Sequence, residues 1–237
     1  MDYKDFAAGQ NNNHFWFKAK KELIDLLMEK TNPGKKELRI LSIGVGTGDD
    51  LDILSKYGSN YITDVDEISL SVIDPSLYTE KKVVSACDLP YADNFFDVVI
   101  SCDVFEHIDD HIKAASEVHR VLKTDGVLIF TVPAFQALFS SHDVALQHFR
   151  RYSKSGIKSL LSNFETKVFF WNSFLFLPIA ATRILNKNSK PSVDEGKLPS
   201  WLNSIFYTLL KIENFLIKKN VSMPFGVSLV GYCYKRK

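Results

Sequence analysis

The sequence predicts an α/β fold, a mostly parallel sheet with helices on both faces. Strand-like and helix-like segments alternate along most of the 237 residues, an order typical of parallel sheets. The segment 95–101, FFDVVIS, is apolar almost throughout, as expected of a strand that is buried on both faces. A glycine-rich turn directly follows the first strand, at the place where such sheets bind their ligands.

Local sequence signals predict where the helices and strands of the first half begin and end. Trp16, Ala19, Leu23 and Leu26 lie at helical spacing and predict an N-terminal helix, which the segment NPGKKE ends. A helix is expected at about 47–56, after the first strand. Asp109 is expected to cap the helix that follows the fourth strand, and the residues TDG (124–126) to end it. The first five strands are predicted at 38–43, 60–65, 82–86, 95–101 and 127–132.

The second half continues the alternation. Ser153 is expected to begin a further helix, and KVFFW (167–171) to form a sixth strand. A seventh strand, VSLVGYCY (227–234), follows only after about fifty residues, which is far more than a hairpin needs. The intervening segment is apolar and contains a long helical pattern.

Composition excludes several classes of protein. The formal net charge is +1, which gives no electrostatic reason to expect nucleic-acid binding. The cysteines, Cys87, Cys102 and Cys233, have no CxxC spacing, so they predict reduced thiols in a cytoplasmic protein and no metal site. The first residues lack an apolar signal-peptide core. The most apolar run, 169–181, is too short to span a bilayer and contains Pro178.

The turn after the first strand carries Gly44, Gly46 and Gly48 in the sequence GVGTGDD. Glycine permits a positive φ and removes the Cβ that would hold a ligand away, so the turn is either a cofactor cradle or a tight structural turn. A dinucleotide turn has the spacing G-x-G-x-x-G. Here Asp49 takes the place of the third glycine and Asp50 follows. Because two carboxylates would repel a pyrophosphate, the turn favours a cationic ligand without phosphate, such as S-adenosylmethionine (SAM).

Four segments resemble successive motifs of the class I SAM-dependent methyltransferases, and most closely the methyltransferase type 11 group: LSIGVGTG, ITDVDEISL, LPYADNFFDVVISCDVFEHIDD and EVHRVLKTDGVLIFTVP. The resemblance extends from about residue 38 to 133. HFWFKAKKELI is similar to the family's entry helix, and SSHDVALQHFRRYSKSGIKSLL to a segment found in a subgroup associated with polysaccharide and lipid modification. The resemblance implies a Rossmann-like sheet of seven strands with an antiparallel last strand, SAM as cofactor, and methyl transfer.

The resemblance also assigns cofactor roles. The backbone around Gly44, Gly46 and Gly48 is expected to hold the methionine part of SAM. Asp66, in preference to Asp64, is expected to accept hydrogen bonds from both ribose hydroxyls. Family members usually have an aspartate at the position of Ser85, so here Ser85 and the backbone of Ala86 or Cys87 are expected to contact the adenine, with about 1 kcal/mol less affinity. Asp103, at the end of the fourth strand, is expected beside the cofactor or the acceptor.

The loop 133–152 opens at the edge of the sheet where the acceptor is expected. We expect His142 or His148 to act as general base, with a nearby aspartate fixing the tautomer, and Arg150 or Arg151 to hold an anionic acceptor. The alternative is a surface loop whose arginines pair with acidic helix starts. Glu106 and His107 either support the neighbouring loop or take part at the site.

The expected organisation has three parts: an N-terminal helical segment (1–36) over the active site, a SAM-binding core (37–171 and 225–237), and a helical insertion (172–224) that caps the acceptor side. The insertion is alternatively a platform for peripheral membrane contact, with Arg183, Lys187, Lys218 and Lys219 beside aromatic residues. The predicted acceptor is a small molecule, a glycan or a lipid-linked molecule, methylated at oxygen. Other functions remain open: a SAM-fold partner subunit without catalysis, and a nicotinamide-dependent reductase.

Overall fold

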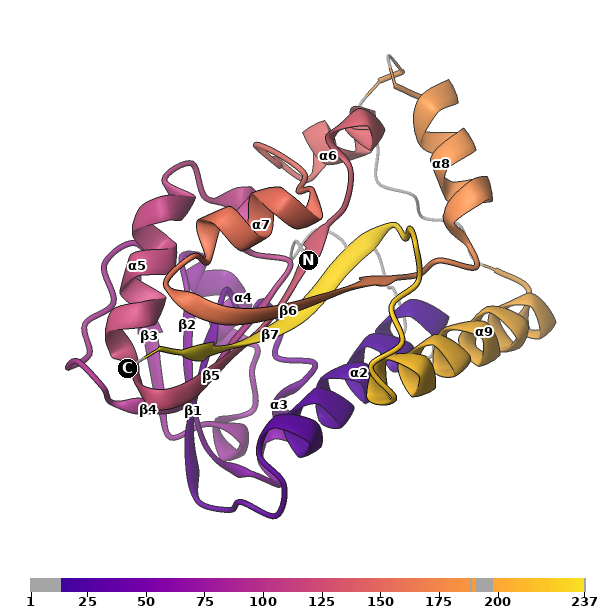
Figure 1. Cartoon of the computed structure of the whole chain (residues 1–237). Coiled ribbons are helices and arrows are strands. Elements are labelled where there is room, and N and C mark those ends of the chain that lie inside the picture. The colour runs from indigo at the N-terminus through magenta and orange to yellow at the C-terminus, as the bar shows by residue number, and fades with distance from the viewer. Residues whose placement is uncertain (1–13, 188, 191–197, 237) are drawn as a thin grey trace.

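The computed structural model describes residues 14–187, 189–190 and 198–236, and its centre is a seven-stranded sheet (Figure 1). The strand order is β3-β2-β1-β4-β5-β7-β6. Every pairing is parallel except those of β7, which runs antiparallel to both β5 and β6. The predicted fold class is confirmed. The strands are β1 (Leu38–Ile43), β2 (Gly58–Asp64), β3 (Glu80–Val83), β4 (Phe96–Cys102), β5 (Leu122–Pro133), β6 (Phe164–Trp171) and β7 (Ser228–Lys235).

Helices cover both faces of the sheet. One face, which includes Ile40 and Val98, packs against α2, α3 and α9. The other, which includes Leu41 and Val99, packs against α5 and α7 (Figure 1). The alternation within β1 and β4 follows from the strand period of two. The α-helices are α2 (Phe15–Thr31), α3 (Leu51–Leu54), α4 (Glu67–Ser71), α5 (His111–Val121), α6 (Ser141–Ala145), α7 (Lys154–Leu160), α8 (Phe176–Leu185) and α9 (Ser200–Lys218); the 3₁₀ turns are η1 (Pro75–Leu77), η2 (Phe105–His107) and η3 (Gln136–Leu138).

Some predicted boundaries are wrong. The helix expected at 47–56 is reduced to α3, because the Gly48 N–H donates to the Val45 carbonyl and closes a turn instead. Asp110, not Asp109, caps α5, and its carboxylate accepts from the Lys113 N–H at 3.0 Å. The residues TDG do not end α5; they lie within β5, which begins directly after the helix. Ser153 does cap α7, accepting from the Gly156 N–H at 3.0 Å.

The insertion is fastened to the core through α9, which lies beside α2 (Figure 1). The Asn214 carbonyl accepts from the Trp171 indole N–H at 3.0 Å, and the Asn214 amide donates to the Ala19 carbonyl at 2.9 Å. Asn214 thereby joins α9 to β6 and to α2. The neighbouring Glu213 accepts from the backbone N–H of Ser173 and Phe174, just beyond β6. In the part of the chain that is described, the helices are too short or too polar to cross a membrane.

Replacing Asn214 with alanine is expected to lower the free energy of unfolding by about 2–3 kcal/mol, because a buried indole N–H and a buried carbonyl both lose their partner. Urea denaturation followed by tryptophan fluorescence measures the change. Thr208→Ala, at an exposed position of the same helix whose hydroxyl bonds only to the carbonyl of Ser204, is the matched control and is expected to change stability by less than about 0.5 kcal/mol. Equal effects of the two substitutions would contradict this role of Asn214.

Candidate active site

The glycine turn after β1 lies tightly against the end of β4. Gly44, Gly46 and Gly48 all have positive φ, at +57°, +56° and +78°. A Cβ on Gly44 would lie 2.7 Å from a methyl carbon of Val104, so any other residue would push the two segments apart. The turn is also fixed from β2, because the Gly46 N–H donates to the Asp64 carboxylate at 2.9 Å.

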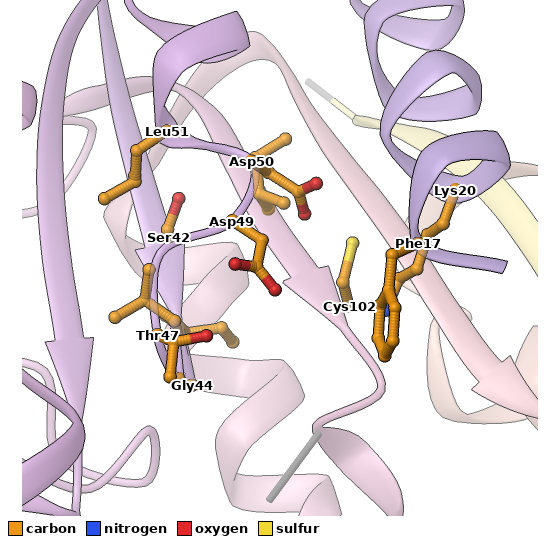
Figure 2. Close-up of a pocket in the computed structure, with 13 residues that line it drawn as sticks. Phe17, Lys20, Ser42, Gly44, Thr47, Asp49, Asp50, Leu51 and Cys102 are labelled. Atoms are coloured by element: carbon orange, nitrogen blue, oxygen red, sulfur yellow. The ribbon is translucent and has the colours of Figure 1, made fainter. Parts of the chain in front are cut away.

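A pocket opens above this turn, and three elements line it (Figure 2). β1 and the turn contribute residues from Ser42 to Leu51, β4 contributes Ile100 and Cys102, and α2 contributes Phe17 and Lys20. Asp49 and Asp50 project from the turn toward the space that separates it from Phe17 and Lys20 (Figure 2). Burial raises the pKa of the Cys102 thiol to about 12, so this thiol stays protonated and is not a nucleophile at neutral pH.

Lys20 forms a buried ion pair with Asp103, and its Nζ lies 2.5 Å from Oδ2. The other oxygen of Asp103 accepts from the Thr131 hydroxyl at 3.0 Å. Burial by itself would raise the pKa of Asp103, but the Lys20 ammonium lowers it to about 2. Burial likewise opposes the charge on Lys20, and the Asp103 carboxylate raises the Lys20 pKa above its usual value. Both groups are therefore charged at neutral pH, and α2 is held over the pocket.

The electrostatics of the pocket suit a ligand that carries charges of both signs. Burial, reinforced by Asp49, raises the pKa of Asp50 to about 6 against the opposing effect of Lys20. At neutral pH the pocket thus presents the Asp50 carboxylate on one wall and the Lys20 ammonium on another. The bare turn at Gly44 lets a ligand approach the backbone closely. These features fit the amino-acid end of SAM and its sulfonium, and they do not fit a pyrophosphate.

The two aspartates considered for the ribose lie at the carboxyl end of β2: Asp64 is its last residue and Asp66 follows it. The Asp64 oxygens accept from the N–H groups of Gly46 and Asp66. Asp66 caps α4, accepting from the N–H groups of Ile68 and Ser69 and from the Ser69 hydroxyl. The hydrogen bond from the Ser69 hydroxyl is the main cause of its lowered pKa. The Asp64 side chain thus lies against the glycine turn and the Asp66 side chain at the start of α4, and the preference for Asp66 stays a prediction.

The segment expected at the adenine follows β3. Ser85 is exposed and its hydroxyl accepts from the Cys87 N–H at 3.1 Å, whereas Ala86 is buried. The next loop, which begins at Leu89, is held from α5: the Leu89 N–H donates to Glu117 at 2.9 Å and the Leu89 carbonyl accepts from Arg120 at 2.7 Å. The structure places Ser85 and Ala86 at the end of β3, and their contact with adenine stays a prediction.

Asp143 organises the loop 133–152. Its side chain is fully buried and accepts from His148 Nδ1 at 2.9 Å and from Arg151 Nε at 2.7 Å. It also accepts from the Ser140 N–H and completes a capping box at the start of α6. Burial opposes its charge, but the hydrogen bond from His148 and the charge of Arg151 hold the pKa of Asp143 well below its usual range. Asp143 is therefore a carboxylate that orients His148.

The arginines and the other histidine of this loop lie in different surroundings. Arg151 is buried and also donates to the Ala134 carbonyl at 3.2 Å. Arg150 is half-buried and donates to the backbone carbonyl of Asp109 at 3.0 Å. His142 lies half-buried on α6. Among the predicted acceptor residues, His148 and Arg151 contact a common partner, Asp143.

The His148 ring lies close to two residues of η2, Glu106 and His107. The ring centroids of His148 and His107 lie 4.5 Å apart, edge to face. Burial lowers the pKa of His107 to about 3, so its imidazole is neutral. Glu106 is fully buried, and neither of its oxygens has a hydrogen-bond partner among the described residues. Burial raises the pKa of Glu106 well above its usual value. Sequence analysis singled out each residue but gave no reason to place the three together.

Sequence analysis did not identify Lys20 as a residue of the site. Its position on α2 looks like a solvated lysine next to Lys21, because periodicity alone does not reveal a partner far away in the chain. Phe17, which lines the same pocket, was likewise not identified. The only available signal was the resemblance of HFWFKAKKELI to an entry helix, which places the segment near the site without naming the residue.

Comparison with known proteins agrees with this geometry. Residues 41–130 match the family model described as a methyltransferase domain. An uncharacterized protein of Methanocaldococcus jannaschii is 30% identical over 66% of this chain and 67% of its own length. The malonyl-[acyl-carrier protein] O-methyltransferase of Geobacter sulfurreducens is also 30% identical, over 61% of this chain but only 55% of its own length. These matches therefore span between about half and two thirds of the relatives.

Among solved structures, a phosphoethanolamine N-methyltransferase of Haemonchus contortus, in complex with phosphomonomethylethanolamine and S-adenosylhomocysteine, shares the fold. Its TM-score is 0.60 at 20% identity, and the similarity covers 91% of this chain and 52% of that one. The motif match, the strand order with its antiparallel β7, and the bare turn facing a charged pocket all indicate one family. The chain belongs to the class I SAM-dependent methyltransferases, and its cofactor is S-adenosylmethionine.

Proposed function

We propose that the protein transfers the methyl group of SAM to an oxygen atom of a small-molecule, glycan or lipid-linked acceptor. The observation that carries this proposal is the pairing of His148 with the buried Asp143 close to the end of β4. A neutral hydroxyl is a weak nucleophile, so an oxygen acceptor benefits from a group that assists loss of its proton. The Geobacter sulfurreducens relative is named as an O-methyltransferase, which supports oxygen.

The residues around the glycine turn bind the cofactor in this proposal. The backbone at Gly44 and Gly46 holds the methionine portion, Asp50 faces the cationic groups, and Lys20 faces the carboxylate. Asp66 binds the ribose, because a carboxylate has about four acceptor sites and the hydrogen bonds that cap α4 leave part of this capacity free. Ser85 and the backbone of Ala86 contact the adenine.

His148 activates the acceptor. Its Nδ1–H donates to Asp143, which leaves Nε2 as the nitrogen that faces the acceptor side. SAM, when bound, supplies an electrophilic methyl group on a positively charged sulfur. With the help of His148 the acceptor oxygen would lose its proton, which passes to solvent water, and would bond to the methyl carbon, while the electron pair of the broken carbon–sulfur bond would stay on sulfur. The chain's main contribution is to align the reactants and exclude water.

Alanine at position 148 is expected to lower kcat by about 100-fold or more while the Kd for SAM stays within about twofold, because His148 acts on the acceptor and not on the cofactor. Methyl release with hydroxyl-bearing acceptors and calorimetric titration of SAM measure the two quantities. His142→Ala tests the other candidate base in parallel. Turnover that survives His148→Ala but is lost in His142→Ala would transfer the role to His142.

Binding of SAM is expected to weaken by up to about tenfold from about pH 7 to about pH 5, because the Asp50 carboxylate, with its pKa raised to about 6, loses its charge over that range. The cation binds the deprotonated form, so affinity increases with pH. Asp50→Asn is expected to bind SAM more weakly at pH 7 and to abolish the pH dependence, which Asp49→Asn retains. An unchanged profile in Asp50→Asn would assign the titration to another group.

The insertion supports an acceptor with an apolar part. Leu177 and Leu185 on α8 are 72% and 83% exposed, and Trp201 on α9 is 65% exposed. Lys187, Lys218 and Lys219 are exposed on the same two helices or directly after them. α8 also adjoins the loop 133–152, since the Ser141 hydroxyl donates to the Asn186 carbonyl at 2.9 Å. We therefore favour a lipid-linked acceptor, reached through peripheral contact of α8 and α9 with a membrane surface.

The full chain is expected to sediment with anionic lipid vesicles, and Leu185→Ser combined with Trp201→Ser is expected to lower the bound fraction several-fold, because both substitutions remove apolar area from the lipid-facing side. Ile112→Ser, at a side chain on α5 that is 69% exposed, is the matched control and should sediment like the unchanged protein. Equal partition of all three proteins to the supernatant would remove membrane contact and leave a water-soluble acceptor.

A further inference from the structure

We propose that Glu106, His107 and His148 together bind a divalent transition-metal ion on the acceptor side of the site. The inference deepens the proposed function and rests on it, because it states how His148 activates the acceptor: as a metal ligand and not as the base itself. Sequence analysis predicted no metal site, because the spacing of the cysteines gave no sign of one.

The geometry brings three potential ligand atoms to one point. One carboxylate oxygen of Glu106 and one ring nitrogen each of His107 and His148 all lie within 4.8 Å of one another. Two of the ligands come from η2 and the third from the loop 133–152. The Phe149 N–H donates to the Glu106 carbonyl at 2.8 Å and joins the two segments. Ligands of a single ion at about 2.1 Å stand about 3.4 Å apart in tetrahedral geometry, so side-chain movements of about 1 Å would close the site.

Glu106 is the observation that requires an explanation. Its side chain is completely buried, yet neither oxygen has a partner among the described residues. An isolated buried carboxyl is costly, and such groups in native proteins are normally hydrogen-bonded or coordinated to a metal. The two imidazoles lie within 4.8 Å of this carboxyl, and an ion between the three would satisfy all of them at once.

Each histidine also has the support that metal-bound imidazoles usually have. His148 is bonded through Nδ1 to Asp143, and Asp143 is itself fixed by Arg151 and Ser140. The backbone of Leu146 lies beside the His107 imidazole and acts to raise its pKa. A carboxylate or carbonyl behind the imidazole fixes the tautomer, so that the other nitrogen presents its lone pair to the metal. The two histidines therefore have oriented rings with a nitrogen directed at the same place.

The ligand set indicates the kind of ion. Two imidazoles and one carboxylate suit Zn²⁺, Fe²⁺, Mn²⁺ or Co²⁺ better than Ca²⁺ or Mg²⁺, which prefer oxygen ligands. Three protein ligands leave at least one coordination position for an exogenous oxygen, as in catalytic metal sites. That position would lie close to β4, since Glu106 follows Cys102, which lines the cofactor pocket, by four residues.

An ion at this position would accept the acceptor's hydroxyl oxygen. Coordination lowers the pKa of a bound hydroxyl, so its proton passes to solvent water near neutral pH. The oxygen then carries the electron pair that forms the new bond to the methyl carbon. This arrangement selects acceptors with a hydroxyl, and most strongly those with a second oxygen nearby that could occupy another coordination position.

Titration of the metal-free full-length chain with Co²⁺, followed by its visible absorption and by calorimetry, tests the site directly. We expect one ion per chain, with Kd raised by about 100-fold or more in Glu106→Gln and in His148→Ala, and by about 10–100-fold in Asp143→Asn, which acts on the ligand His148. His119→Gln, at a histidine on α5 outside the cluster, is the matched control and should bind Co²⁺ as the unchanged chain does. The Kd for SAM, measured on every variant, shows that each is folded.

Failure to bind Co²⁺ or Zn²⁺, or binding that survives both Glu106→Gln and His148→Ala, would overturn the metal site. Metal binding is measured without an acceptor, so the two proposals can fail separately. If the protein binds the ion but methylates no hydroxyl group, the proposed oxygen acceptor is wrong and the metal site stands. With a hydroxyl acceptor that turns over, chelation is expected to abolish methyl transfer and added Zn²⁺, Mn²⁺ or Co²⁺ to restore it. Full turnover of the metal-free chain would overturn the assigned role of the ion.

Discussion

The close contact between the turn after β1 and the end of β4 is the constraint on which the site depends. The missing Cβ at Gly44 allows the Val104 methyl groups to approach the backbone. Because of this approach, residues on both sides of Val104 reach the site: Cys102 lines the cofactor pocket, and Glu106 lies against the loop 133–152. A side chain at position 44 would separate these segments and would disturb the cofactor pocket that they line.

Two groups of buried charged residues lie near that contact, one in the wall of the cofactor pocket and one in the loop 133–152. The Lys20–Asp103 pair joins α2 to the segment after β4 and places the Lys20 ammonium in the wall of the cofactor pocket. Asp143, held by Arg151, gives the loop 133–152 a fixed carboxylate against which His148 is oriented. Each charge is compensated inside the protein, as buried ions must be. The same backbone segment, from Asp103 to His107, contacts both groups: Asp103 pairs with Lys20, and His107 lies against His148.

The sequence predicts the elements whose signals are local. β1 was predicted with its observed bounds, because its apolar residues end at a glycine, and Ser153 was correctly identified as a helix cap. The length of the helix after β1 was overestimated, because the pattern of apolar residues does not reveal the turn that ends at Gly48. Residues joined across long stretches of chain could not be foreseen: Lys20 resembles a solvated lysine until Asp103 is placed against it, and Glu106 and His148 come from separate segments.

The position of β7 has a consequence for biosynthesis. β7 lies between β5 and β6, yet both insertion helices, α8 and α9, precede it in the chain. During translation β6 therefore leaves the ribosome without a neighbour, and the edge of β5 stays open until β7 is made. Open strand edges invite association with other chains. The nascent protein consequently passes through an interval in which these strand edges are open to association, and this interval lengthens with any slowing of translation across 172–227.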